Sequence, residues 1–204
     1  MKERPILFSG PMVRAILEGT KTQTRRVVQP QPAQQLYQIS DSIEFAPRSA
    51  RDADAPDWAR CQTCPYGAPG DRLWVRETWQ VDEAGPLQSR TLTGHVRYAS
   101  DDRVRFCGIP KGAISPGTML APGRWRPSIH MPRWASRIDL EITGVRVERL
   151  QDISEADMCA EGLDRAPYGD PSAGFQVLWD MINAKRGYSW ASNPWVWALE
   201  FQRV

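Results

Sequence analysis

A lysine and a threonine three residues apart, Lys21 and Thr24, lie in the segment EGTKTQTRR, residues 18–26. A hydroxyl group is a weak nucleophile at neutral pH and needs a base within hydrogen-bond distance. A lysine amine can be that base when burial or a neighbouring cation lowers its pKa, and Arg25 and Arg26 can supply the cation. The segment therefore predicts either a Lys–Thr catalytic pair or a solvated basic turn.

The elements around this segment decide whether the two side chains can meet. Pro11 suits the first turn of a helix, and Gly19 suits the residue just past its end, so we predict a short helix between them. The β-branched residues from Thr20 onward predict a strand. In a regular strand residues 21 and 24 point to opposite faces, so the catalytic reading requires irregular backbone just after Gly19.

Further elements follow in the second half of the chain. Residues 138–150 alternate in polarity as strands do, with a break expected at Gly144. LQDISEADMCAEGL predicts a helix with Ser154 as its N-cap, Asp157 three residues on and Gly162 as its stop. A third helix is expected at about 173–184, with Phe175, Leu178 and Ile182 on one face, and a closing strand in PWVWALEFQRV.

Strands joined by short helices predict an α+β fold. A sheet this small must cover its edges, so we expect it to be closed or nearly closed. The chain has 204 residues and 17 prolines. This length suits a single domain, residues 1–204, and the prolines concentrate in two stretches that we expect to be long loop insertions, at about 29–69 and 107–134.

The segment around Lys21 resembles the signature of the ASCH superfamily, G-x-K-x-x-E-x-R after the first helix. Gly19, Lys21 and Arg26 match it, and Thr24 stands where the family usually has Glu. A Thr stands there in the branch of small bacterial N4-acetylcytidine amidohydrolases, and ISEADMCAEG resembles the helix that carries their later Glu, which places Glu161 at that position. The resemblance covers the following residues, in the family's order: 5–28, 70–80, 136–163 and 194–204.

The resemblance implies a PUA-like β-barrel with short helices, and both insertions are foreign to the small amidohydrolases. The arrangement of core and insertions also looks like that of uncharacterised phage and prophage ASCH proteins. The implied activity is hydrolysis of an acylated nucleobase or nucleoside such as N4-acetylcytidine, with no cofactor required. Thr24 would be the nucleophile, Lys21 the general base and Glu161 the acid/base, while Arg26 or backbone N–H groups past Gly19 face the oxyanion. Glu161 has a structural alternative, an ion pair with Arg26 at a helix end.

Two other regions are candidates for substrate binding. Glu77, in VRETW, faces the same cavity if the sheet closes, and otherwise it is an exposed strand residue paired with an arginine. The run at 124–137 interleaves arginine with tryptophan, as a surface for single-stranded RNA does. Its candidate binding residues are Arg124, Trp125, Arg133 and Trp134. Alternatively, the tryptophans plug one end of the barrel and the arginines stay solvated.

Cysteine spacing raises the question of a metal. Cys61 and Cys64 form a C-x₂-C pair, the spacing with which two thiolates grip one zinc ion. Cys107, with a histidine, could complete a structural zinc site. The alternative is a set of reduced thiols.

Charge and hydropathy say little about partners. The net charge is +2, so attraction for nucleic acid must come from local arginines. No stretch has the length of a membrane span and the N-terminus does not resemble a signal peptide, so we expect a cytoplasmic protein without membrane association. Two further functions stay open beside the amidohydrolase, an RNA- or modified-base-binding module without catalysis and an ASCH-type ribonuclease. The sequence leaves protein partners unknown.

Overall fold

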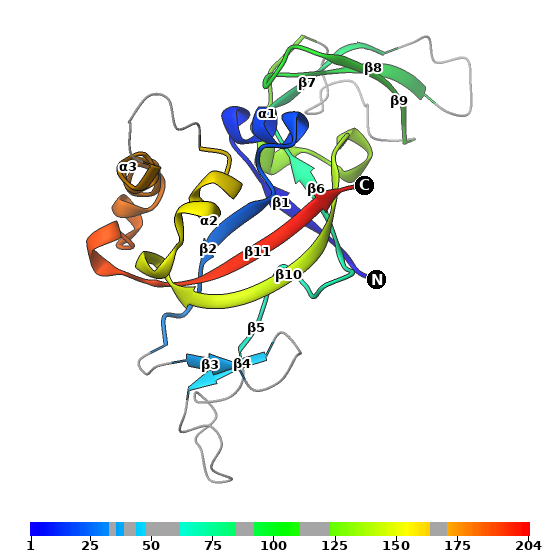
Figure 1. The fold of residues 1–204 in the computed structure, drawn as a ribbon. Helices are drawn as coiled ribbons and strands as arrows, with labels where there is room; N and C mark the ends of the chain where they lie inside the picture. The colour runs from blue at the N-terminus through cyan, green and yellow to red at the C-terminus, as the bar shows by residue number, and fades with distance from the viewer. Residues whose placement is uncertain (33–35, 39–43, 48–61, 85–91, 111–122, 164–170) are drawn as a thin grey trace. The chain divides into compact units, whose positions relative to one another are not determined.

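The computed structural model describes residues 1–32, 36–38, 44–47, 62–84, 92–110, 123–163 and 171–204 (Figure 1). The helices are α1 (Gly10–Glu18), α2 (Glu155–Ala160) and α3 (Pro171–Asn183). The strands are β1 (Glu3–Leu7), β2 (Gln23–Val27), β3 (Leu36–Gln38), β4 (Glu44–Pro47), β5 (Gln62–Thr63), β6 (Arg72–Arg76), β7 (Trp79–Ala84), β8 (Leu92–Tyr98), β9 (Val104–Ile109), β10 (Asp139–Arg149) and β11 (Trp195–Arg203). Five 3₁₀ turns are also described, η3 (Ser128–His130), η4 (Arg133–Ala135), η5 (Leu150–Asp152), η6 (Ala184–Arg186) and η7 (Trp190–Ser192). The predicted α+β class is confirmed.

The chain divides into two compact units. The first unit comprises Met1–Lys2, Glu18–Arg72 and Glu141–Gln202. The second unit comprises Glu3–Leu17, Leu73–Leu140 and Arg203–Val204. Among the described residues, no sheet closes on itself to form a barrel.

In the first unit, β10, β11 and β2 lie side by side in that order (Figure 1). β11 pairs with β2 in antiparallel fashion, so that Leu199 lies opposite Thr24 and Glu200 opposite Gln23. Helix α2 packs against β2 and α3. The core of this unit consists of Leu150, Ile153, Met158, Phe175, Trp179 and Val196.

The residues that were predicted to begin and end the helices lie at the helix ends. Ser154 caps α2 and its side chain accepts a hydrogen bond from the Asp157 N–H at 3.1 Å. Gly19 and Gly162 follow α1 and α2 with φ of +79° and +83°, the left-handed conformation that glycine adopts without a Cβ clash.

Two element-level predictions are wrong. Strand β10 runs through Gly144 without a break. A Cβ at this position would lie 2.8 Å from the Glu200 carboxylate, so glycine permits a close approach here and does not end the strand. On α3, Ile182 is exposed and Trp179 is buried, with its indole N–H donating to the Tyr188 carbonyl at 2.8 Å.

The first predicted insertion contains regular structure in its described parts. β3, β4 and β5 form a three-stranded antiparallel sheet in that order. Strands of two to four residues are too short for a visible alternation of polarity, so the sequence did not indicate them.

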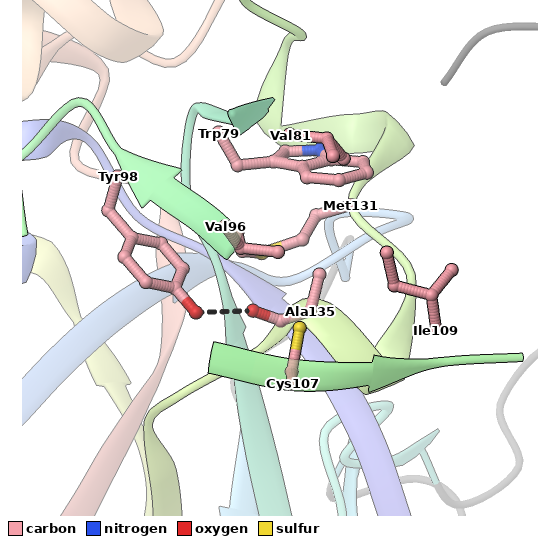
Figure 2. Close-up of a cluster of buried hydrophobic side chains, with 8 residues drawn as sticks. All are labelled: Trp79, Val81, Val96, Tyr98, Cys107, Ile109, Met131 and Ala135. Atoms are coloured by element: carbon pink, nitrogen blue, oxygen red, sulfur yellow. Dashed lines mark hydrogen bonds between the residues drawn. The ribbon is translucent and has the colours of Figure 1, made fainter. Parts of the chain in front are cut away.

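The second unit contains α1, the neighbouring strands β1 and β6, and an antiparallel sheet in the order β7–β8–β9. One face of that sheet covers a core of eight residues, Trp79, Val81, Val96, Tyr98, Cys107, Ile109, Met131 and Ala135 (Figure 2). The Tyr98 hydroxyl donates to the Ala135 carbonyl at 2.9 Å, as the dashed line in Figure 2 shows. This bond ties η4, which begins at the end of the second predicted insertion, to the core.

Candidate functional site

Lys21 and Glu161 meet in the first unit, although 140 positions separate them along the chain. The Lys21 Nζ lies 2.7 Å from Glu161 Oε2 and 2.8 Å from the Glu161 carbonyl oxygen. The Lys21 side chain is fully buried and that of Glu161 is 6% exposed. The structure thus forms a buried amine–carboxylate pair from two distant segments.

Backbone pairing at the start of β2 brings these segments together. Lys21 forms an isolated antiparallel bridge with Glu161, which follows the last residue of α2, and the Thr22 N–H donates to the Ala160 carbonyl at 2.8 Å. The regular strand begins only at Gln23. Lys21 therefore lies outside β2, in the irregular backbone after Gly19 that the catalytic reading requires.

The electrostatic surroundings favour the neutral form of the Lys21 amine. Burial has the largest effect and lowers its pKa below the ordinary 10.5. Glu161 acts in the opposite direction through its charge and its hydrogen bond, and the charges of Arg26 and Arg25 lower the pKa further. The net direction is downward, which is what a lysine base needs.

Thr24 is buried next to this pair but is not bonded to it. The Lys21 Nζ donates to the Gln23 carbonyl at 2.9 Å, which is the carbonyl that precedes Thr24 in the chain. Alternation within β2 puts Thr24 on the face opposite Gln23 and Arg25. Among the described residues, none forms a hydrogen bond with the Thr24 hydroxyl.

A network of charges that the sequence reading did not include surrounds Glu161. Arg25 Nη1 lies 3.3 Å from Glu161 Oε1, and Arg25 also contacts Glu148 and Asp157. Arg146 contacts Glu148, Asp157 and Glu200. Asp157 lies one helical turn before Glu161, so the i, i+4 spacing on the predicted helix was a signal that the two carboxylates share a face.

The other two residues of the family signature are also placed. Gly19 ends α1 as described above. Burial lowers the pKa of Arg26, Tyr66 and Glu161 act in the opposite direction, and the charge of Arg186 lowers it further. Arg26 therefore lies in the electrostatic surroundings of the Lys21–Glu161 pair.

Glu77 belongs to a separate, buried ion pair in the second unit. It accepts hydrogen bonds from the Ser100 hydroxyl at 2.5 Å and from Arg137 Nε at 2.9 Å. The Arg137 guanidinium also lies 3.9 Å from the centre of the Tyr98 ring. Glu77 therefore pairs with an arginine, as the alternative interpretation predicted, but it is buried and not exposed.

The arginines and tryptophans of residues 124–137 divide into two groups. Arg124 and Trp125 are exposed. Trp134 packs edge-on against Trp79 at 5.7 Å between ring centres, and Arg133 pairs with Glu3 at 3.0 Å and Asp139 at 2.9 Å. The exposed candidates for binding a base are therefore Arg124 and Trp125.

The structure places two of the three candidate zinc ligands. Cys64 and Cys107 are buried, and Cys61 lies outside the described residues. Among the residues that the structure describes, no three His, Cys, Asp or Glu side chains are grouped to hold a metal ion.

No known protein family, curated protein or solved structure matches the chain. No helix within the described ranges is long and apolar enough to span a membrane.

Proposed function

We propose that the chain is a PUA-like, ASCH-type hydrolase that cleaves the amide bond of an acylated nucleobase or nucleoside such as N4-acetylcytidine. The observation that supports this most is the buried contact between Lys21 Nζ and Glu161 Oε2 at 2.7 Å. These are two of the three residues that the resemblance assigns to catalysis, and 140 positions separate them along the chain. A buried amine–carboxylate pair with a lowered lysine pKa is also a typical sign of a functional site.

In the proposed reaction the Thr24 hydroxyl attacks the acyl carbonyl and Lys21, as the neutral amine, takes the hydroxyl proton. The C–N bond then breaks, and Glu161 passes to the departing amine the proton that Lys21 took from Thr24. Water hydrolyses the resulting ester on Thr24 and releases the acid. Arg26 or the N–H groups after Gly19 would stabilise the oxyanion, and such donors are typically worth ~3 kcal/mol.

The present bonds of Lys21 define what must change on substrate binding. Its Nζ donates to three oxygens, those of Gln23 O, Glu161 O and Glu161 Oε2, which is the donor capacity of an ammonium ion. Loss of one proton from this group, which its lowered pKa favours, would free a lone pair. The Thr24 hydroxyl, which strand alternation places on the face opposite Gln23 and Arg25, must then turn toward that amine and come within about 3 Å of it in the substrate complex.

The test is incubation of the purified protein with a panel of acylated nucleosides, followed by chromatography of the products. We expect release of cytidine from N4-acetylcytidine by the wild-type protein and its loss in Thr24→Ala, with an unchanged circular dichroism spectrum. Thr24→Ser keeps a hydroxyl and should keep measurable activity. Equal activity in Thr24→Ala would refute the assignment of the nucleophile.

A binding module without catalysis is the second candidate, favoured by Trp125, which is 44% exposed beside Arg124. It predicts salt-dependent affinity for single-stranded RNA that Trp125→Ala weakens, with no turnover of any nucleoside. Cleavage of the RNA that survives Thr24→Ala would instead indicate a ribonuclease.

A further inference from the structure

Arg25 has the most completely bonded side chain of the site. Its side chain is fully buried, and its Nε lies 2.8 Å from Glu148 Oε1. Its Nη1 donates to Gln23 Oε1 at 2.6 Å and to Glu161 Oε1 at 3.3 Å. Its Nη2 contacts Asp157 Oδ2 at 3.1 Å and Glu148 Oε1 at 2.6 Å. All three guanidinium nitrogens are therefore engaged.

The carboxylate of Glu161 is divided between two cations. Oε1 faces Arg25, and Oε2 faces Lys21 at 2.7 Å. Glu161 follows the last helical residue of α2, where the partial negative charge of the helix end disfavours a carboxylate. Two cations offset that repulsion, and together they fix the carboxylate at both oxygens.

The anchors of Arg25 are themselves held. Arg146 Nε bonds Glu148 Oε2 at 2.9 Å, and Arg146 Nη2 bonds Asp157 Oδ2 at 2.8 Å. Arg146 also contacts Glu200, and among the described residues it forms no ion pair or hydrogen bond with Lys21 or Glu161. Arg25 thus connects β2 to β10 and α2, while Arg146 holds the same two acids from the outside.

We propose that Arg25 is a positioning residue of the candidate site, which holds Oε1 of Glu161 so that Oε2 faces Lys21. Its catalytic meaning rests on the proposed function, but its effect on the Lys21 amine does not. Lysine cannot replace it, because a single ammonium group cannot hold Gln23, Glu148, Asp157 and Glu161 in one planar fork.

Charged groups on every neighbouring element surround the Lys21–Glu161 pair. They are Arg25 and Arg26 on β2, Asp157 and Glu161 at α2, Arg146 and Glu148 on β10, and Glu200 on β11. Of these, Glu161, Arg26 and Arg25 shift the pKa of Lys21. Removing Arg25 takes away a cation that lowers the Lys21 pKa and releases Glu161, which raises it. Both effects move the titration of Lys21 to higher pH.

The test is an NMR titration of protein labelled with ¹³C at the lysine ε-carbon. The chain has four lysines, Lys2, Lys21, Lys111 and Lys185, so four signals are expected, and Lys21→Arg identifies the one that belongs to Lys21. In Arg25→Gln we expect the Lys21 midpoint to rise by about one pH unit. The matched control is Arg146→Gln, which disturbs the same acids and should leave the midpoint unchanged.

An unchanged midpoint in folded Arg25→Gln, or an equal rise in Arg146→Gln, would overturn the proposal. If Arg25→Gln does not fold, Arg25→Lys takes its place in the same titration. There the released Glu161 carboxylate should turn to Lys21 and raise the midpoint, and no rise would again overturn the proposal.

Turnover separates this inference from the proposed function. If the wild-type protein deacetylates N4-acetylcytidine, we expect Arg25→Gln to lower kcat by on the order of 10- to 100-fold, with little change in KM and a pH profile moved upward. If the wild-type protein hydrolyses no acylated nucleoside, the proposed function fails, and the titration still decides the role of Arg25.

Discussion

The contact between Lys21 and Glu161 is a demanding arrangement for two charged side chains. Removing a carboxylate and an amine from water costs several kcal/mol each, and their mutual attraction offsets that cost only with good geometry and further hydrogen bonds. Both conditions hold here, because Lys21 also donates to two backbone carbonyls and Glu161 also faces Arg25. Each residue therefore depends on the other more than surface partners would.

A double-mutant cycle measures that dependence. Lys21→Met leaves the Glu161 carboxylate buried with one cation fewer, and Glu161→Leu leaves a buried amine, so each change should reduce the free energy of unfolding by about 3–5 kcal/mol. The double variant should lose at least about 0.5 kcal/mol less than the sum of the two. Urea denaturation gives the values, and strictly additive losses would show that the two side chains are not coupled.

The lowered pKa of Lys21 predicts a pH dependence of activity. The neutral amine is the active base, so the rate should rise with pH through a midpoint below 10.5, the ordinary lysine value. Lys21→Arg keeps a positive charge but stays protonated, so it should be inactive throughout the range. A rising limb centred at or above 10.5 would mean that Lys21 is not the base.

The free energy of unfolding should also depend on the protonation of Lys21. Between the lowered folded pKa and the unfolded pKa near 10.5, the unfolded chain binds the additional proton. The free energy of unfolding should therefore rise with pH across that window and stop rising above it. The rise should be absent in Lys21→Met.

At the scale of elements, α2 holds Glu161 in place. It has only six residues, and its start is fixed by the hydrogen bond from the Asp157 N–H to Ser154 Oγ. Asp157 also forms ion pairs with Arg25 and Arg146. Loss of the cap should therefore weaken the contacts of Asp157 with both Arg25 and Arg146, and with them the network that surrounds Glu161.

Ser154→Ala tests the cap. We expect a loss of about 1 kcal/mol in the free energy of unfolding, because one N–H of the first turn loses its acceptor. Ser154→Asp supplies another acceptor and should restore most of it. Chemical denaturation of the three proteins gives the comparison, and equal stability of Ser154→Ala and wild type would show that the cap does not hold α2.

The sequence predicts elements where local signals are strong. The Ser154 cap and the glycines at 19 and 162 act within one turn of the chain, so α1 and α2 were found with nearly correct limits. Gly144 was misread because its reason lies on another strand, in the Glu200 carboxylate above it. Trp179 was missed for a similar reason, since its partner Tyr188 follows the helix.

The same distinction holds for the candidate site. Lys21 and Glu161 were predicted together through the resemblance and not from their chemistry, because no local pattern links residues so far apart. Arg25 was considered only as a nearby cation. Its partners Glu148 and Asp157 come from two other elements, and only the folded chain brings them together.

At the scale of the whole molecule, some arginines pair with acids in the interior and others lie on the surface. The net charge of +2 hides this division, since Arg25 and Arg137 are paired with buried acids while Arg124 is exposed. A basic surface cannot therefore be inferred from the number of arginines in residues 124–137.

Two substitutions in residues 124–137 should show that a buried arginine and an exposed one contribute differently to the free energy of unfolding. Arg137→Ala leaves Glu77, which is 2% exposed, without its cation and should cost about 3–5 kcal/mol in the free energy of unfolding. Arg124→Ala should change it by no more than about 0.5 kcal/mol. Thermal and urea unfolding of the two variants check this, and similar losses in both would contradict the division.

Each unit also has its own core, around Phe175 and Trp179 in the first and around Trp79 and Tyr98 in the second. The residues proposed for catalysis, Lys21, Thr24 and Glu161, all belong to the first unit. The account therefore assigns the chemistry to the first unit.

The most direct test of the central claim is the rate at which wild-type and Glu161→Gln proteins release cytidine from N4-acetylcytidine, at equal concentrations of folded protein. Glutamine keeps the size of the side chain and its carbonyl oxygen but cannot transfer the proton. We predict release by the wild-type protein and a rate lower by about 10²-fold or more in the variant. No release by the wild-type protein, or equal rates in the two, would contradict the proposal that the buried Lys21–Glu161 pair carries out hydrolysis.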